Sequence, residues 1–147
     1  VNTAFSEVIT QCAAPRAKQP GTWILPPMRQ AYLQLHQSGH AHIIVVWHHD
    51  ILVGGFYGVQ VGALFCGESM FNRTPNSAKL ALMALQLHLQ QVAPGWIDCQ
   101  LPNPFLLQLG ASTVPRADYI KLLHQQRSLA VPANHWQPGP LNMDRFL

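Results

Sequence analysis

Apolar side chains recur at intervals of three and four residues in several stretches, which is the spacing of one face of an α-helix. The clearest stretch is 76–92, where Asn76 can cap the first turn. Its apolar face consists of three leucines, Leu82, Leu85 and Leu89. A second helix is predicted over 26–39, opened by proline and closed by Gly39. Further helical patterns cover 5–12, 103–110 and 117–128.

Between the two strongest helical patterns the sequence becomes rich in branched and aromatic residues, as in β-strands. Three strand-like runs follow one another at about 41–48, 51–59 and 62–69. The turns between them fall at His49-Asp50 and at Gln60–Gly62, and such short connections favour an antiparallel meander. After the next helix, WIDCQ (96–100) is predicted to form a strand and STVPR (112–116) a short strand or sheet edge.

This order of elements, a meander followed by a β-α-β unit, resembles the N-acetyltransferase-like (GNAT) architecture. We therefore expect an α/β (α+β) fold with a mixed, mostly antiparallel sheet flanked by helices, formed by residues 1–147 as one domain. Acetyl-CoA enzymes of this architecture open their main helix with a glycine-rich loop that binds pyrophosphate through backbone N–H groups. The corresponding FNRTPNSAK (71–79) has no glycine, and Pro75 lacks an N–H, so we expect neither CoA nor another cofactor.

Composition narrows the class of protein further. The chain is 48% hydrophobic and 10% charged, with a net charge of +3. Its cations are scattered, which permits a polyanionic partner without a polybasic arm. Three cysteines without CxxC spacing argue against a disulfide framework or a zinc site, and they fit the reducing cytoplasm. No signal peptide or apolar run of about 18 residues is present, so no membrane partner is expected. The eight histidines form no metal-ligand pattern, so no metal is expected.

WIDCQ puts one of only six acidic residues into strand-like sequence. If residues 95–100 form a central strand, Asp98 and Gln100 share a face, because alternate residues point the same way. A buried carboxylate without a partner costs several kcal/mol. Asp98 is therefore either a structural residue bonded to backbone or arginine, or part of a reactive site.

GESMF (67–71) raises the same question for Glu68, which is expected to end the third strand. Near Asp98 it would complete a site with paired carboxylates. The alternative is a hydrated acid at the sheet edge.

Several segments together are similar to one family, the bacterial leucyl/phenylalanyl-tRNA–protein transferases. They are GTWI (21–24), AYLQLHQSGHAH (31–42), LVGGFYGV (52–59), GALFCGESMFNR (62–73), IDCQ (97–100), LGA (109–111) and PRADY (115–119). The resemblance implies transfer of Leu, Phe or Met from Leu-tRNA, Phe-tRNA or Met-tRNA onto the N-terminal Arg or Lys of acceptor proteins. That reaction marks the acceptor for degradation through the N-degron pathway, in the cytoplasm.

The resemblance also implies roles for particular residues. Asp98 and Gln100 match the catalytic pair, and Glu68 matches an acid of the same site. Eight residues match the apolar amino-acid pocket: Trp23, Phe56, Phe65, Met70, Leu82, Leu85, Leu89 and Ile97. Each could instead be plain core. Three cations are candidate phosphate contacts or ordinary surface charges: Arg73, Lys79 and Arg116.

The sequence departs from the family in two places. Members usually carry a smaller N-terminal domain, whereas twenty residues precede GTWI here, which implies a short form lacking most of that domain. The stretch after IDCQ usually contains His and Ser, whereas Phe105 and Gln108 occur here. The alternatives to an active transferase are a non-catalytic or re-purposed module that binds tRNA 3′ ends or basic N-termini and, less favoured, an acyl-CoA N-acyltransferase.

Overall fold

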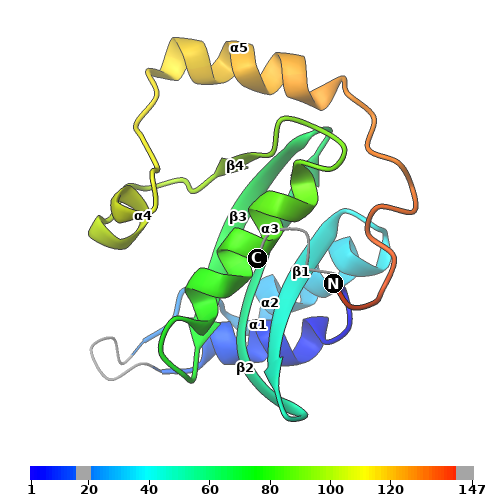
Figure 1. Ribbon diagram of the computed structural model, residues 1–147, viewed down its shortest axis with the longest axis vertical. Helices are drawn as coiled ribbons and strands as arrows, with labels where there is room; N and C mark the ends of the chain where they lie inside the picture. The colour runs from blue at the N-terminus through cyan, green and yellow to red at the C-terminus, as the bar shows by residue number, and fades with distance from the viewer. Residues whose placement is uncertain (16–20, 142–147) are drawn as a thin grey trace.

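The computed structural model describes residues 1–15 and 21–141 and contains one four-stranded sheet in the order β1-β2-β3-β4 (Figure 1). The strands are β1 (Ala41–His48), β2 (Ile51–Val61), β3 (Leu64–Asn72) and β4 (Trp96–Asp98). The helices are α1 (Phe5–Ala13), α2 (Pro26–Gln37), α3 (Ser77–Leu89), α4 (Pro104–Gln108) and α5 (Arg116–Arg127). Strands β1 to β3 pair antiparallel, and β4 pairs parallel with β3. The predicted mixed, mostly antiparallel sheet flanked by helices is confirmed.

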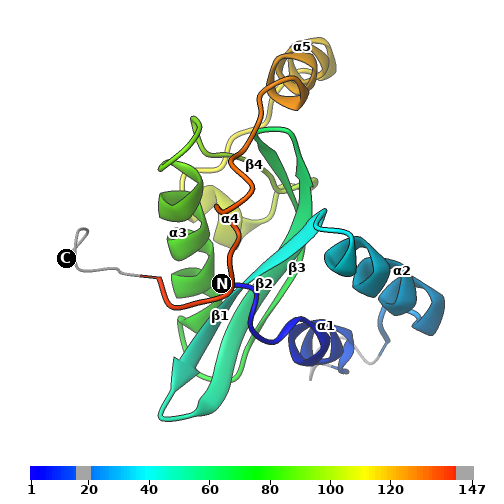
Figure 2. The ribbon, with the colours of Figure 1, turned by 90° about the vertical axis from the view of Figure 1, so that its right-hand side faces the viewer.

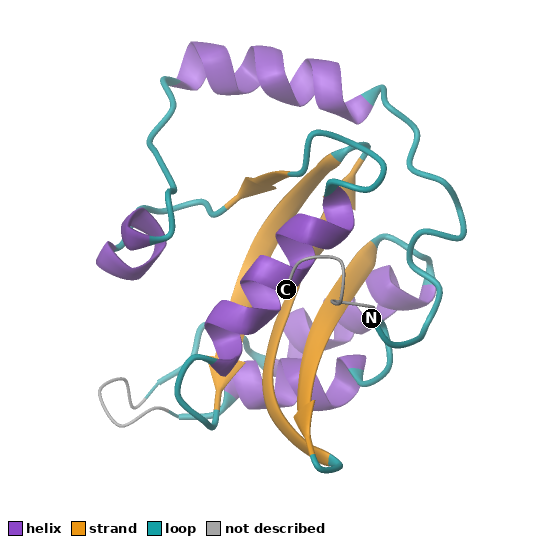
Figure 3. Cartoon of the chain, in the orientation of Figure 1, coloured by secondary structure: helices purple, strands orange, loops and turns teal. Residues whose placement is uncertain are grey.

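Helices cover both faces of the sheet, as Figures 2 and 3 show. Helices α1 and α2 pack on one face around the buried Tyr57, Ile43 and Phe71. Helix α3 packs on the other face around Phe65 and Phe56. The segment after α5 returns to this second core through Trp136, which is 8% exposed.

The first turn forms where the sequence predicts it, and the second lies slightly later than predicted. His49 and Asp50 both have positive φ (45° and 58°), and Gly62 has φ 58°. Strand β3 nevertheless begins and ends later than predicted, because β2 continues to Val61 and the turn closes on residues 62 and 63. Glu68 therefore lies inside β3 and not at its end, beside a register shift between Tyr57 and Gly58 of β2.

The second half of the chain departs further from expectation. WIDCQ forms a strand only over 96–98, and β4 lies at the edge of the sheet, not at its centre. Residues 112–116 form no strand, because Pro115 lacks an N–H and this segment connects α4 to α5 away from the sheet. Asn76 precedes α3 as predicted but has φ 66° and no side-chain capping bond. Residues 14–21, whose two prolines and basic residues predict a loop, lie largely outside the described residues.

None of the helices in the described ranges is both long and apolar enough to cross a membrane.

Candidate functional site

Asp98, the last residue of β4, accepts hydrogen bonds at both carboxylate oxygens. The hydroxyl of Tyr119, on α5, donates to Oδ2 at 2.7 Å. The backbone N–H of Gln100 donates to Oδ1 at 2.8 Å. The carboxylate is half-buried, and among the described residues it forms no ion pair with Lys, Arg or His. It is thus a negative charge held in a fixed orientation at an open strand edge.

Gln100 leaves the strand, because its φ of 63° turns the backbone into the left-handed region. Its side-chain Nε2 donates to the carbonyl oxygen of Gly67, in β3, at 2.9 Å. In the described part of the chain, Oε1 has no hydrogen-bond partner, and the residue is exposed. The amide therefore offers a carbonyl oxygen to solvent.

Glu68 is the second carboxylate of this region. The hydroxyl of Tyr32, on α2, donates to its Oε2 at 2.8 Å. Burial, followed by this bond and the charge of Glu68, raises the pKa of Tyr32, so the tyrosine stays protonated as a donor. Cys66, two residues earlier in β3, pairs with Asp98 across the sheet.

The Cys66 thiol lies within the electrostatic influence of both carboxylates. Burial, and then the negative charges of Asp98 and Glu68, raise the pKa of the Cys66 thiol to about 11. The thiol therefore remains neutral near pH 7, which excludes it as a ready nucleophile. Cys99 is similar, because burial and Asp98 raise its thiol pKa as well. The candidate reactive groups of this region are therefore its oxygen-containing side chains and not its thiols.

The predicted apolar set lies on the opposite face of the sheet. Its buried members pack in the core under α3, and they are Phe56, Phe65, Leu82, Leu85 and Leu89. Met70 and Ile97 are partly buried at the margin of this core. Ile97 faces α3 while its neighbour Asp98 points to the other side, as strand alternation requires. The acids and most of the apolar residues thus lie on opposite faces of the sheet, on either side of the edge strand β4.

Trp23 does not join this apolar core. It precedes α2, is 47% exposed, and follows the part of the chain that covers the other face. The three candidate cations are also separated. Arg73 and Lys79 flank the turn between β3 and α3, whereas the exposed Arg116 begins α5. Together they make no compact basic patch.

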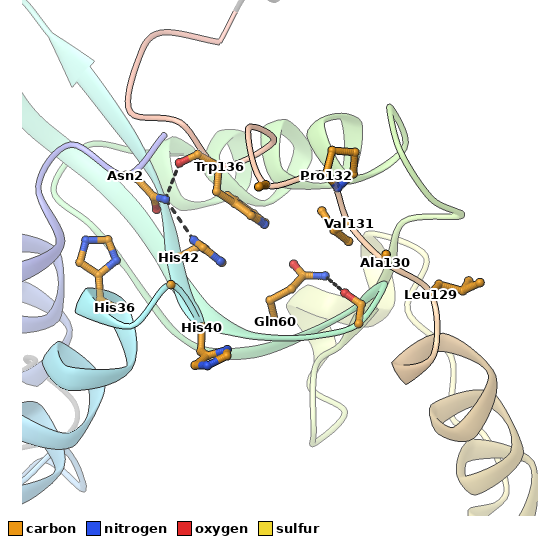
Figure 4. A pocket seen from close by; sticks show the side chains of 13 residues that line it. Asn2, His36, His40, His42, Gln60, Leu129, Ala130, Val131, Pro132 and Trp136 are labelled. Carbon is orange, nitrogen blue, oxygen red and sulfur yellow. Dashed lines mark hydrogen bonds between the residues drawn. The ribbon is translucent and has the colours of Figure 1, made fainter.

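A cavity of about 410 Å³ lies between the start of β1, the end of β2 and the segment after α5 (Figure 4). None of the residues that line it is Lys, Arg, Asp or Glu. His42 stacks on Trp136 with ring centroids 4.2 Å apart, and Asn2 contacts its Nδ1 at 3.0 Å. Burial lowers the pKa of His42 to about 3, so its ring is neutral at physiological pH. The cavity is lined by none of the carboxylates described above.

Two tyrosines to which the sequence assigns no role complete the candidate site. Tyr32 on α2 and Tyr119 on α5 each donate a hydrogen bond from the hydroxyl to a carboxylate of the sheet. In the sequence, both tyrosines lie in segments that resemble the family, AYLQLH and PRADY, but the resemblance assigns no role to either of them. Across the residues described, no group of three or more His, Cys, Asp or Glu could hold a metal ion.

Comparison with known proteins gives one consistent result. The family described as leucyl/phenylalanyl-tRNA protein transferase matches residues 1–124. Proteins named leucyl/phenylalanyl-tRNA–protein transferase from Shewanella woodyi and Tolumonas auensis are 47% and 48% identical over 144 and 143 residues. One from Shewanella piezotolerans is 49% identical over 136 residues. These matches cover 98%, 97% and 92% of this chain but only 61%, 61% and 58% of the relatives' lengths.

Proposed function

The chain belongs to the leucyl/phenylalanyl-tRNA–protein transferase family, and from this premise we propose that it transfers Leu, Phe or Met from aminoacyl-tRNA to the N-terminal Arg or Lys of acceptor proteins. The observation that carries the proposal is the pairing of Asp98 with Gln100 at an open strand edge. A cytoplasmic location follows from the donor, since aminoacyl-tRNA is made and used there. The acceptor would then enter the N-degron pathway.

The reaction does not require a strong acid or base from the protein. The donor is an activated ester, and the acceptor α-amine has a pKa of about 7.7–8.0, so part of it is neutral at pH 7. The amine nitrogen attacks the ester carbonyl carbon and forms the new C–N bond. The C–O bond to the ribose breaks, and the proton lost by nitrogen ends on the ribose oxygen.

Two groups suit that step. The free Oε1 of Gln100 can accept a hydrogen bond from the attacking amine and fix its direction of approach. Nitrogen gains positive charge during attack, and the Asp98 carboxylate next to it stabilises that charge. Because Tyr119 and Gln100 already hold the Asp98 carboxylate by hydrogen bonds, the carboxylate does not have to reorient when the amine arrives.

The edge position of β4 supports a division of the substrate between the two faces of the sheet. We assign the aminoacyl side chain to the α3 side, with the partly buried Met70 and Ile97 at the surface and the buried members of the apolar set beneath them. The basic acceptor end belongs to the other side, where Glu68 and Asp98 have no cationic partner among the described residues. Apolar contacts separate similar side chains by only about 1–3 kcal/mol, which suits a donor range of Leu, Phe and Met.

One assay tests the proposal. The chain is incubated with radiolabelled Leu-tRNA or Phe-tRNA and a peptide beginning with Arg or Lys, and label in the peptide is measured. We expect Asp98→Asn to lower the transfer rate at least about 100-fold, because it removes the charge that stabilises the ammonium. Asp118→Asn is the matched control: Asp118 is exposed and, among the described residues, pairs only with Lys121 at 3.4 Å, so the rate should stay within about twofold.

Three outcomes contradict the proposal. Binding of the tRNA or peptide without transfer of label would make the chain a binding module. Transfer from acetyl-CoA in place of aminoacyl-tRNA would make it an acyl-CoA enzyme. Equal rates for Asp98→Asn and Asp118→Asn would remove Asp98 from the mechanism.

A further inference from the structure

Resting on the function proposed above, we propose that Tyr119 is a positioning residue for the transfer reaction: its hydroxyl holds the Asp98 carboxylate so that Asp98 and Gln100 keep one fixed arrangement. Tyr119 would act through these two residues and need not touch the substrate. The hydroxyl thereby makes α5 part of the site.

The hydrogen bonds form a continuous series from α5 to the centre of the sheet. Tyr119 donates to Asp98 Oδ2, and Asp98 Oδ1 accepts the backbone N–H of Gln100. The Gln100 side chain in turn donates to the carbonyl oxygen of Gly67 in β3. Since the two oxygens of Asp98 are bound from different directions, the carboxylate cannot rotate without breaking one bond. Gln100 depends on this arrangement because its backbone is in the left-handed region.

Tyr119 is well suited to donate a hydrogen bond and poorly suited to transfer a proton. The bond to Asp98, together with burial, raises the pKa of Tyr119 to about 12. The hydroxyl is therefore protonated throughout the neutral range. A positioning role is consistent with this state, whereas a general base would have to lose its proton.

The contact is more than an attachment point for α5. Most residues of α5 are exposed, and in the described structure Tyr119 is the only α5 side chain that hydrogen-bonds to a strand. The other end of the helix is held by backbone: Ala63 N–H donates to the Gln126 carbonyl at 2.9 Å. Gly62 lies directly against Gln126 and Arg127, where a methyl group would meet backbone atoms at 2.2–2.7 Å. Removing one hydroxyl should leave this second attachment in place.

The test compares Tyr119→Phe with Tyr57→Phe. Each variant loses one tyrosine hydroxyl, but that of Tyr57 is buried and has no hydrogen-bond partner among the described residues. For Tyr119→Phe we expect kcat for transfer to fall about 10- to 100-fold with KM changed by no more than about twofold, since orientation is lost and binding is kept. Tyr57→Phe should leave both constants within about twofold.

A second measurement does not need activity. In Tyr119→Phe the backbone amide of Gln100 should exchange with solvent several-fold faster by NMR, because Asp98 Oδ1 is no longer held beneath it. An unchanged Gln100 amide together with an unchanged kcat would overturn the positioning role. A change in KM with kcat unchanged would also overturn it, because that result would assign Tyr119 to substrate binding. If neither the wild type nor any variant transfers label, the proposed function fails. Faster exchange of the Gln100 amide in Tyr119→Phe would still show that the Tyr119 hydroxyl holds the hydrogen-bonded arrangement.

Discussion

Acid should destabilise this fold through His88, and the size of the effect can be worked out from its surroundings. His88 lies near the end of α3 and is only 5% exposed. Its ring stacks on His135 at 3.8 Å and meets Trp136 edge-on at 4.9 Å. Burial, and then repulsion from His135, lower its pKa to about 4. In the unfolded chain the same ring has a pKa of about 6.5.

The sign follows from the two pKa values. Between pH 6.5 and about 4 the unfolded chain binds a proton that the folded chain does not, so stability is complete above pH 6.5 and falls as the pH falls. From pH 7 to pH 5, His88 lowers the free energy of unfolding by about 2 kcal/mol. The size depends mainly on the pKa in the unfolded chain, because the ring in the folded chain is still mostly neutral at pH 5. His42, 5% exposed with a pKa of about 3, should contribute a similar loss.

The measurement is urea unfolding at pH 7 and pH 5. The wild type should lose about 4 kcal/mol from the two histidines, and His88→Phe should lose about 2 kcal/mol, because Phe keeps the stacked ring but cannot bind a proton. His124→Ala is the matched control, since it removes an exposed histidine from α5 and should keep the wild-type loss. If His88→Phe shows the same pH dependence as the wild type, burial of His88 does not govern the acid sensitivity and the reasoning is refuted.

Two further predictions concern the packing of residues in the sheet. Tyr57→Phe should raise the free energy of unfolding by about 1–2 kcal/mol, because it removes a fully buried hydroxyl that has no partner in the described structure; a loss of stability in urea unfolding would show that the hydroxyl is satisfied. Gly58→Ala should cost about 2–3 kcal/mol, since a methyl group there would lie 2.2 Å from the Cys66 carbonyl oxygen and 2.4 Å from the Phe65 ring. Gly139→Ala, where nothing lies within 4 Å, should be close to neutral, and equal melting temperatures for the two variants would contradict the prediction.

The meander and the main helices could be predicted from the sequence, because each rests on local periodicity and local turn chemistry. His49, Asp50 and Gly62 adopt the positive φ that their turns require. Leu82, Leu85 and Leu89 fall on one face of α3 at any packing angle. Where the pattern was short, the prediction was weaker: STVPR has two branched residues and a proline, and it connects two helices instead of joining the sheet.

The sequence alone also pointed to the candidate site residues, through the motifs GESMF and IDCQ, but it did not determine their geometry. The tertiary structure decided that β4 is a three-residue edge strand, that Glu68 sits at a register shift inside β3, and that acids and apolar residues occupy opposite faces. It also decided that Tyr32 and Tyr119 bind the two carboxylates. The physical reason is range: periodicity fixes which neighbours on one strand share a face, whereas strand order and helix docking join residues tens of positions apart and are set by the packing of the whole chain.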